Sequence, residues 1–484
     1  MTIKRLLIFA PLVLIIILLQ SYLWVPTYEQ PTRGNPDRLT TYVTASTGDA
    51  SLLNPILSAD SASSEIASQV FEGLIDRDQN LQYRGRVASG WELYEEAYFY
   101  VNPQASPSGT DSTDPQSVAD LIRSAKASNA PMDPKLRATL DRITDITVLP
   151  PQRFTTTLKD ADATTKSPAA DIEFTVDAPA RIKLRLSEVD QNLLDHLQSL
   201  LGESYFEAFE STRYLHPDQP LPAERLDAYA RDILPSTEQN PVIVFHLRAG
   251  VRFHDGHPVG ADDVRFTYEA IMNPKNLSPR TSDYEPVKTV EVIDPLTVRI
   301  VYKRLYSPAI GTWQMGILPE HLLNREALRK EALARGLDPQ NFSVRDSNFN
   351  RRPVGCGPFK FKEWKSDQYI ILDRFQEYWD GPPNYETFAY RIIPNVLTQE
   401  MEFYAGTVDS YSVQPYQVAR LRGDPLFQSF SGLSFGYTYI GYNMRREPFN
   451  DRRVRLALGM AIDVDKIIKY VLYGQGERLS LIHI

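Results

Sequence analysis

The stretch from Val242 to Pro274, VIVFHLRAGVRFHDGHPVGADDVRFTYEAIMNP, decides the fold of this chain. Apolar and polar residues alternate at its start, and this period of two predicts a half-buried strand. Ala249-Gly250 and Asp255-Gly256 supply the glycines that tight turns need. Asp262 and Asp263 then place negative charge where a helix begins. The stretch therefore predicts a strand, a tight turn, a short strand, a second turn and a helix.

The composition is that of a globular protein of several domains. The chain has 484 residues, of which 42% are hydrophobic and 23% are charged, and this length is enough for two or three domains. Its formal net charge of -9 argues against a nucleic-acid partner, which requires a basic face. Cys356 is the only cysteine, so neither an intrachain disulfide nor a cysteine metal cluster can form. We interpret Cys356 as a small residue that fills its Gly-Cys-Gly turn.

The N-terminus predicts a membrane segment. Lys4 and Arg5 precede an apolar run over residues 6–25, and a helix of that length spans about 30 Å, the thickness of a bilayer core. The basic start orients the rest of the chain to the periplasmic, extracytoplasmic side of the inner membrane. No Ala-x-Ala site follows, so we expect residues 1–27 to be an uncleaved signal anchor, with a cleaved signal peptide as the alternative. Residues 28–39 then form a linker.

Several further motifs occur in order along the chain. They are Leu53-Asn54-Pro55, Val70-Phe71-Glu72-Gly73-Leu74, Val87-Ala88-Ser89-Gly90-Trp91, Pro353-Val354-Gly355-Cys356-Gly357-Pro358-Phe359, Tyr378-Trp379-Asp380-Gly381, Ala405-Gly406-Thr407-Val408-Asp409, Pro448-Phe449-Asn450-Asp451-Arg452-Arg453-Val454-Arg455 and Ala461-Ile462-Asp463. Together with the opening stretch, they resemble the family 5 extracellular solute-binding proteins, the peptide-, oligopeptide- and nickel-type binding components of ABC importers. The resemblance covers about Thr40 to Trp91 and Pro241 to Gly476.

This resemblance implies an α/β fold of the type II periplasmic binding protein class, with two lobes around a cleft and an extra domain. Residues 40–75 and 316–394 would form lobe I, residues 76–315 a second domain, and residues 395–484 lobe III. Full-length relatives continue past this chain's last residue, so we expect a C-terminally truncated chain with an incomplete lobe III. Apolar side chains from Asn395 to Gly476 should then face solvent.

Residues 94–240 depart from the family pattern, which has a short hairpin in this place. Arg153–Lys159, Ile172–Val176 and Arg181–Leu186 predict strands, the last two joined in a hairpin by a turn at residues 177–180. We expect an inserted α+β subdomain on the surface, because loops tolerate long insertions. Such a subdomain would not contribute to the cleft.

The same resemblance implies a function in binding rather than catalysis. The protein would capture a peptide or a similar small solute in the interlobe cleft and deliver it to the permease of an ABC transporter, without a cofactor. Two segments match parts of the family that line or approach the cleft, the second of them a strand. Their candidate ligand-binding residues are Asp60, Ser61, Ala62 and Ser63 in the first and Tyr437, Tyr439 and Asn443 in the second.

The sequence contains no nucleophile-elbow, phosphate-loop or His-Glu-x-x-His motif. His254-Asp255-Gly256-His257 is the one cluster that suggests a metal site, but few sites are built from two imidazoles and a carboxylate on one turn. We therefore interpret it as a turn. Two other functions stay open: a membrane-tethered hydrolase whose site lies in the insertion, and a sensor or scaffold that retains the binding fold and signals to a membrane partner.

Overall fold

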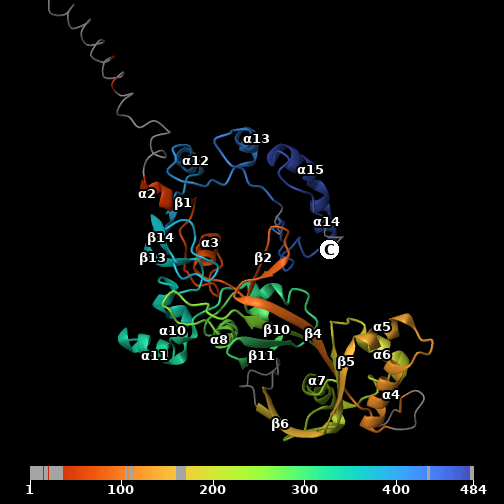
Figure 1. Ribbon diagram of the computed structural model, residues 1–484. Helices are drawn as coiled ribbons and strands as arrows, with labels where there is room; N and C mark the ends of the chain where they lie inside the picture. Colours follow the sequence, from red (N-terminus) through yellow and green to blue (C-terminus); the bar gives the residue numbers. More distant parts are fainter. Residues whose placement is uncertain are drawn as a thin grey trace, which may run out of the picture. The chain divides into compact units, whose positions relative to one another are not determined.

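The computed structural model describes residues 36–103, 106–107, 113–159, 171–432 and 436–479, with the single positions Ile15 and Gln20. The chain divides into compact units between Pro394 and Asn395 (Figure 1). Apart from Ile15 and Gln20, the predicted membrane segment lies outside the described residues. Within the described ranges, the structure contains no helix whose length and apolar character would suffice to cross a membrane.

The unit Asn35–Pro394 contains a four-stranded sheet built from both ends of its sequence. Its strands are β1 (Thr41–Ser46), β13 (Phe359–Lys365), β14 (Tyr369–Arg374) and β15 (Thr387–Ile392). They lie in the order β1-β15-β14-β13. β1 runs parallel to β15, with Thr41 opposite Thr387, and the other neighbours are antiparallel. β1, the first strand of the unit, therefore forms its backbone hydrogen bonds with β15, the last strand.

The second sheet has six strands, and all of its pairs are antiparallel. Its strands are β4 (Ala88–Tyr100), β5 (Ile143–Leu149), β8 (Arg181–Leu186), β10 (Thr237–Leu247), β11 (Val287–Asp294) and β12 (Thr297–Tyr302). They lie in the order β11-β12-β10-β4-β8-β5. One core of buried side chains, among them Phe245 of β10 and Leu372 of β14, joins this sheet to the first.

The opening stretch of the sequence folds largely as predicted. The expected strand is the second half of β10, and the helix α8 (Ala261–Met272) follows it. The two turns contain Gly250 and Gly256, whose φ angles of 86° and 90° lie in the left-handed region that favours glycine. The short strand between the turns is reduced to one bridge, between Arg252 and Pro258.

Short elements surround the two sheets in this unit. They are α2 (Pro36–Thr40), α3 (Ser61–Val70), β2 (Ile75–Arg77), β3 (Tyr83–Gly85), α9 (Thr281–Tyr284), α10 (Glu320–Leu323) and α11 (Arg325–Ala334). β2 and β3 form a small antiparallel ribbon. A single 3-10 turn, η2 (Gly311–Gln314), lies between β12 and α10.

The insertion grows out of the second sheet. β4 and β10 pair from Ala88↔Leu247 to Phe99↔Thr237, so the hairpin that the family pattern predicts is lengthened, and β5 and β8 extend its sheet. Figure 1 shows the elements of the insertion gathered beyond the far end of β4. Besides β5 and β8, the insertion contains α4 (Pro115–Ala127), α5 (Pro134–Arg142), β6 (Gln152–Lys159), β7 (Asp171–Ala178), α6 (Leu193–Leu201), β9 (Leu215–Pro217) and α7 (Ala223–Ile233).

The predicted hairpin across residues 177–180 is wrong. β7 pairs with β6 and β9 in a separate three-stranded sheet, whereas β8 pairs with β4 and β5. The reason is that their apolar faces enter different cores. Phe174 of β7 is buried beside α7, while Leu184 of β8 is buried beneath α4, α5 and α6. Asp177 and Ala178 therefore end β7, and Pro179 and Ala180 connect the two sheets.

The unit that begins at Asn395 is helical wherever it has regular structure in the described residues. Its helices are α12 (Val396–Tyr404), α13 (Val418–Arg422), α14 (Arg452–Ala461) and α15 (Val464–Lys466), followed by a single π turn, Ile467–Val471. The strand predicted through Tyr437 and Asn443 is wrong, because no strand among the described residues of this unit supplies its hydrogen bonds. The expected exposure of apolar side chains is confirmed, since Phe430 is 84% and Met460 85% exposed.

The separate cores of the insertion lead to a prediction about deletion. Replacing residues 95–241 with Asn-Gly should give a tight hairpin between Tyr94 and Val242, which lie opposite each other in the register. All side chains of the two insertion cores lie within the removed segment, and none belongs to the core between the large sheets. We expect the variant to unfold cooperatively in a thermal melt followed by circular dichroism. An aggregated or non-cooperative product would show that the main core needs the insertion.

Candidate functional site

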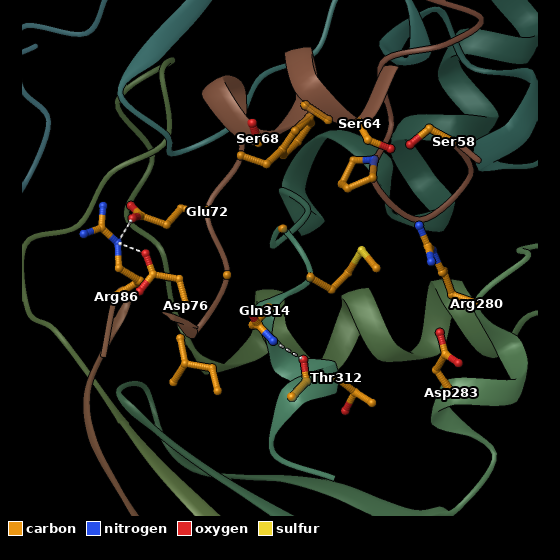
Figure 2. Close-up of a pocket in the computed structure, with 18 of the residues that line it drawn as sticks. Ser58, Ser64, Ser68, Glu72, Asp76, Arg86, Arg280, Asp283, Thr312 and Gln314 are labelled. Carbon is orange, nitrogen blue, oxygen red and sulfur yellow. Dashed lines mark hydrogen bonds and ion pairs between the residues drawn. The ribbon is translucent and has the colours of Figure 1, made fainter. Parts of the chain in front are cut away.

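A pocket of about 590 Å³ opens in the unit Asn35–Pro394 (Figure 2). Its walls come from α3, the loop before it, the segment that leads into β2, the α9 region and η2. The lining is a mixture of polar and apolar residues, with Phe71 and Met315 among the apolar members. The polar lining residues are Ser58, Ser64, Ser68, Gln69, Glu72, Asp76, Arg86, Arg280, Asp283, Thr312 and Gln314.

Helix α3 provides one wall because its faces differ. Ile66 and Val70, four residues apart, are fully buried in the main core. Ser64 and Ser68, also four residues apart, lie on another face and line the pocket. Their hydroxyl groups donate to the backbone carbonyl oxygens of Asp60 and Glu65, at 2.8 and 2.7 Å. Such small side chains leave space in front of the helix.

Glycines let the neighbouring segments approach the end of α3. A Cβ atom on Gly355 would lie 2.0 Å from the carbonyl oxygen of Val70, and one on Gly316 would lie 2.5 Å from Cβ of Phe71. These distances leave no room for any side chain. Cys356, next to Gly355, is fully buried, and burial raises the pKa of its thiol above the ordinary value. The Gly-Cys-Gly motif is thus a close-packed turn, and its thiol is not poised as a nucleophile.

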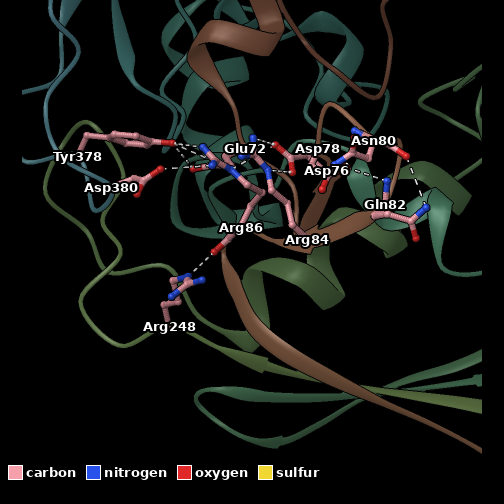
Figure 3. A network of polar contacts seen from close by, with 10 residues as sticks. All are labelled: Glu72, Asp76, Asp78, Asn80, Gln82, Arg84, Arg86, Arg248, Tyr378 and Asp380. Atoms are coloured by element: carbon pink, nitrogen blue, oxygen red, sulfur yellow. Dashed lines mark hydrogen bonds and ion pairs between the residues drawn. The ribbon is translucent and has the colours of Figure 1, made fainter. Parts of the chain in front are cut away.

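Glu72 is the centre of a buried polar network beside the pocket (Figure 3). Its carboxylate accepts hydrogen bonds from Arg86 Nε at 2.5 Å, Trp379 Nε1 at 2.7 Å and Tyr378 OH at 3.0 Å. Arg86 also donates from Nη2 to Tyr378 OH at 2.7 Å and forms an ion pair with Asp380 at 3.3 Å. The network therefore joins the motif at residues 70–74 to the Tyr-Trp-Asp-Gly motif, far away in the sequence.

The electrostatics of this network favour the ionised pair. Burial alone would lower the pKa of Arg86, but the negative charge and hydrogen bonds of Glu72 outweigh it, and the pKa is raised. Burial, together with the charge of Glu72, raises the pKa of Tyr378 above its ordinary value. The phenol therefore stays neutral and donates its proton to the carboxylate. Because each of these groups already has partners, the network serves to hold the wall rather than to react.

The His254–His257 turn does not assemble a metal site. His254 donates from Nε2 to the carbonyl oxygen of Gly357 at 3.0 Å and accepts at Nδ1 from the Gly355 N–H at 3.2 Å. Both ring nitrogens are thereby occupied. His257 stacks on His321 with ring centroids 4.0 Å apart. Within the described residues, no group of three His, Cys, Asp or Glu side chains is arranged to hold a metal ion.

The first predicted ligand segment lies at the start of α3 and forms its cap. Asp60 accepts from the Ser63 N–H and Ser63 hydroxyl, both at 2.7 Å, and from the Ser51 hydroxyl at 2.5 Å. Burial would raise the pKa of Asp60, but these hydrogen bonds outweigh it and lower the pKa. Ala62 and Ser63 are buried, and Ser61 is exposed. The contacts give this segment a capping role, and its role in ligand binding stays a prediction.

The second predicted segment belongs to the other unit. Tyr437 and Tyr439 are 60% and 72% exposed, and their ring centroids lie 5.8 Å apart. Asn443 is exposed and accepts from the Arg445 N–H at 3.1 Å through its side-chain oxygen. Their role in binding likewise stays a prediction.

Sequence reasoning missed the pocket residues Ser68, Glu72 and Arg280. The four-residue spacing of small serines on α3 was a signal for Ser68, and an acid inside an otherwise apolar motif was a signal for Glu72. Arg280 had no such signal, because its position depends on contacts between segments far apart in the sequence.

Comparison with known proteins identifies the family. Residues 229–481, just over half of the chain, match the model of the bacterial extracellular solute-binding proteins, family 5 middle region. The chain belongs to this family. It is 34% identical over 236 residues to the oligopeptide-binding protein AppA of Bacillus subtilis (48% of this chain, 41% of AppA). It is 28% identical over 250 residues to heme-binding protein A of Haemophilus influenzae (48% of this chain, 44% of the relative).

Solved structures of family members share the fold. AppA of Bacillus subtilis, in complex with a nonapeptide, superposes with a TM-score of 0.52 at 21% identity, covering 91% of this chain and 57% of AppA. NikZ of Campylobacter jejuni, in complex with Ni(L-His), also has a TM-score of 0.52, at 18% identity, covering 91% of this chain and 56% of NikZ. The family 5 chain thus has the mixed α/β fold of type II periplasmic binding proteins. It spans less than half the length of the curated relatives it matches.

The buried network predicts that removing the charge of Glu72 strongly destabilises the fold. Glu72→Gln keeps the shape of the side chain but removes the closest negative charge from Arg86, which retains its hydrogen bond to the neutral Tyr378 and longer ion pairs with Asp76 and Asp380. We expect a loss of about 2–4 kcal/mol in the free energy of unfolding, measured with urea. The control Glu269→Gln removes an exposed partner of Arg265 and should cost less than about 0.5 kcal/mol. Equal effects would contradict the structural role of Glu72.

The environment of His254 predicts a pH dependence of stability. Burial lowers the pKa of His254 to about 4, below the usual 6.5. Since the folded state holds the neutral ring, the unfolded state binds the proton more readily, and stability is lost as the pH falls from about 6.5 towards 4. Between pH 7.5 and pH 5 the loss should be about 2 kcal/mol. Urea unfolding of wild type and His254→Gln at both pH values isolates this contribution. If the free energy of unfolding fell by the same amount in both proteins between pH 7.5 and pH 5, the result would contradict the role of His254.

Proposed function

We propose that this family 5 chain belongs to an extracytoplasmic solute-binding protein that captures a peptide or a similar small solute and delivers it to the permease of an ABC transporter. The observation that carries the proposal is the pocket beside α3, lined by both polar and apolar side chains, in a chain whose family consists of binding proteins rather than enzymes. The relatives AppA and heme-binding protein A carry different solutes in their names. The proposal therefore names the class of solute only broadly.

The character of the pocket supports binding. Serine hydroxyls and the Gln69 and Gln314 amides offer hydrogen bonds in several directions, and Phe71 and Met315 offer apolar contact. Small-molecule sites combine these features. The acids Glu72 and Asp76 are ion-paired with Arg86 and Arg84, so they do not form an acid–base pair for catalysis.

The proposal extends to the organisation of the whole protein. Residues 40–75 and 316–394 would form lobe I, residues 76–315 the second domain with its insertion, and residues 395–484 part of lobe III. Residues 6–25 would tether the protein to the cytoplasmic membrane from its outer side. The basic and apolar pattern of the N-terminus supports this anchoring.

A binding assay tests the proposed function. A thermal-shift screen of the 484-residue chain against short peptides, nickel–histidine and haem should find at least one class that raises the melting temperature, because a ligand stabilises the state it binds. Ser68→Trp should fill the pocket and weaken binding of that class at least about tenfold.

The matched control places the same bulk elsewhere. Ser124→Trp, on an exposed face of α4, should bind like the wild type. Stabilisation by no solute class, or equal binding by Ser68→Trp and Ser124→Trp, would contradict the proposal.

A further inference from the structure

One cation in the pocket has no side-chain partner among the residues that the structure describes. The Nε atom of Arg280 is buried, and its guanidinium group makes no hydrogen bond, ion pair or ring contact with any described residue. The backbone N–H of Arg280 donates to the Ser278 hydroxyl at 3.2 Å. The Nη groups are not buried and have no partner among the described residues, so they are the donors open to a ligand. A donor without a partner favours a ligand that accepts from it.

A second donor faces the same space. Ser58 is 2% exposed, and its hydroxyl makes no hydrogen bond with the described residues, although its backbone N–H donates to the Asn54 carbonyl oxygen at 2.9 Å. Both Ser58 and Arg280 line the pocket. Figure 2 shows the Arg280 side chain extending from the start of α9 toward Ser58.

The two donors are held in place by a contact between their segments. The Ser278 hydroxyl donates to the carbonyl oxygen of Ile56 at 2.6 Å, and Ser278 is itself almost buried. Ile56 precedes Ser58 by two residues, and Ser278 precedes Arg280 by two residues. This hydrogen bond therefore fixes the two segments together close to both donors, so little ordering is needed when a ligand binds.

The acids of the pocket do not neutralise Arg280. Glu72 and Asp76 form ion pairs with Arg86 and Arg84. Asp283 lies three residues beyond Arg280, but among the described residues it forms no ion pair with it. The guanidinium charge is therefore available to an anion in the pocket.

We infer that Arg280 and Ser58 form a subsite for a carboxylate group of the bound solute. A planar guanidinium matches the two oxygens of a carboxylate, and a hydroxyl adds a third hydrogen bond. The inference rests on the proposed solute-binding function of this pocket. It names Arg280 as the residue that selects solutes with a free carboxylate over their amides.

Acetate is the simplest probe, and it tests the subsite without assuming a solute. In 1H–15N spectra of the arginine Nε–H groups of the full chain, the Arg280 signal, assigned with Arg280→Lys, should shift saturably with acetate and not with acetamide. Ser58→Ala should weaken the acetate effect several-fold. The signal of Arg265, whose partner is Asp262 at the surface, should not move. No shift with acetate, or a shift only with inorganic phosphate, would overturn the carboxylate subsite.

Trialanine and its C-terminal amide separate this inference from the proposed function. In calorimetry, wild type should favour the free acid by about tenfold to a hundredfold, the range of a charge-assisted hydrogen bond. Arg280→Gln should remove that preference, while Arg265→Gln should keep it. An unchanged preference in Arg280→Gln would overturn the subsite but leave solute binding intact. An acetate response without trialanine binding would support the subsite and contradict peptide as the solute.

Discussion

The carboxylate of Glu72 is buried where distant segments of the chain meet, and this constraint organises the unit Asn35–Pro394. A carboxylate away from water requires compensating charge and hydrogen bonds. Arg86, Tyr378 and Trp379 provide them. Arg86 lies just before β4, whereas Tyr378 and Trp379 lie between β14 and β15. The network joins the end of α3 to the segment after β14. The turn that contains Cys356 packs against the same end of α3.

The pocket follows from this arrangement. Gly316 and Gly355 allow close approach to Phe71 and to the end of α3, and Gly73 allows close approach to the backbone of Gln314, so the walls of the pocket pack tightly against each other. Serines on the free face of α3 leave the space open. The ion pair of Glu72 with Arg86 holds the shape of the pocket. Arg280 has no such partner within the described residues. A firm wall with a few available donors suits binding without chemistry, as expected for this family.

The insertion shows how a large segment can be added without disturbing that centre. It continues an existing antiparallel pair, β4 with β10, rather than interrupting a core. Its two apolar cores contain none of the residues that line the pocket. The edge of the sheet is extended by β8 and β5, so the hydrogen bonds of the lengthened strands are satisfied locally.

The sequence by itself determined the strand and helix of residues 242–274 and the strands β6, β7 and β8 of the insertion, because periodicity and turn glycines act over short distances. The resemblance of its ordered motifs indicated the family. It also indicated that Cys356 fills a turn. Only the tertiary structure decided which strands pair. The alternation within β7 and β8 shows that each is a strand but not which core buries it, and so the predicted hairpin failed. The same holds for the pocket. Ser58 and Arg280 come together through Ser278 and Ile56, a contact between segments far apart along the chain that no local pattern encodes.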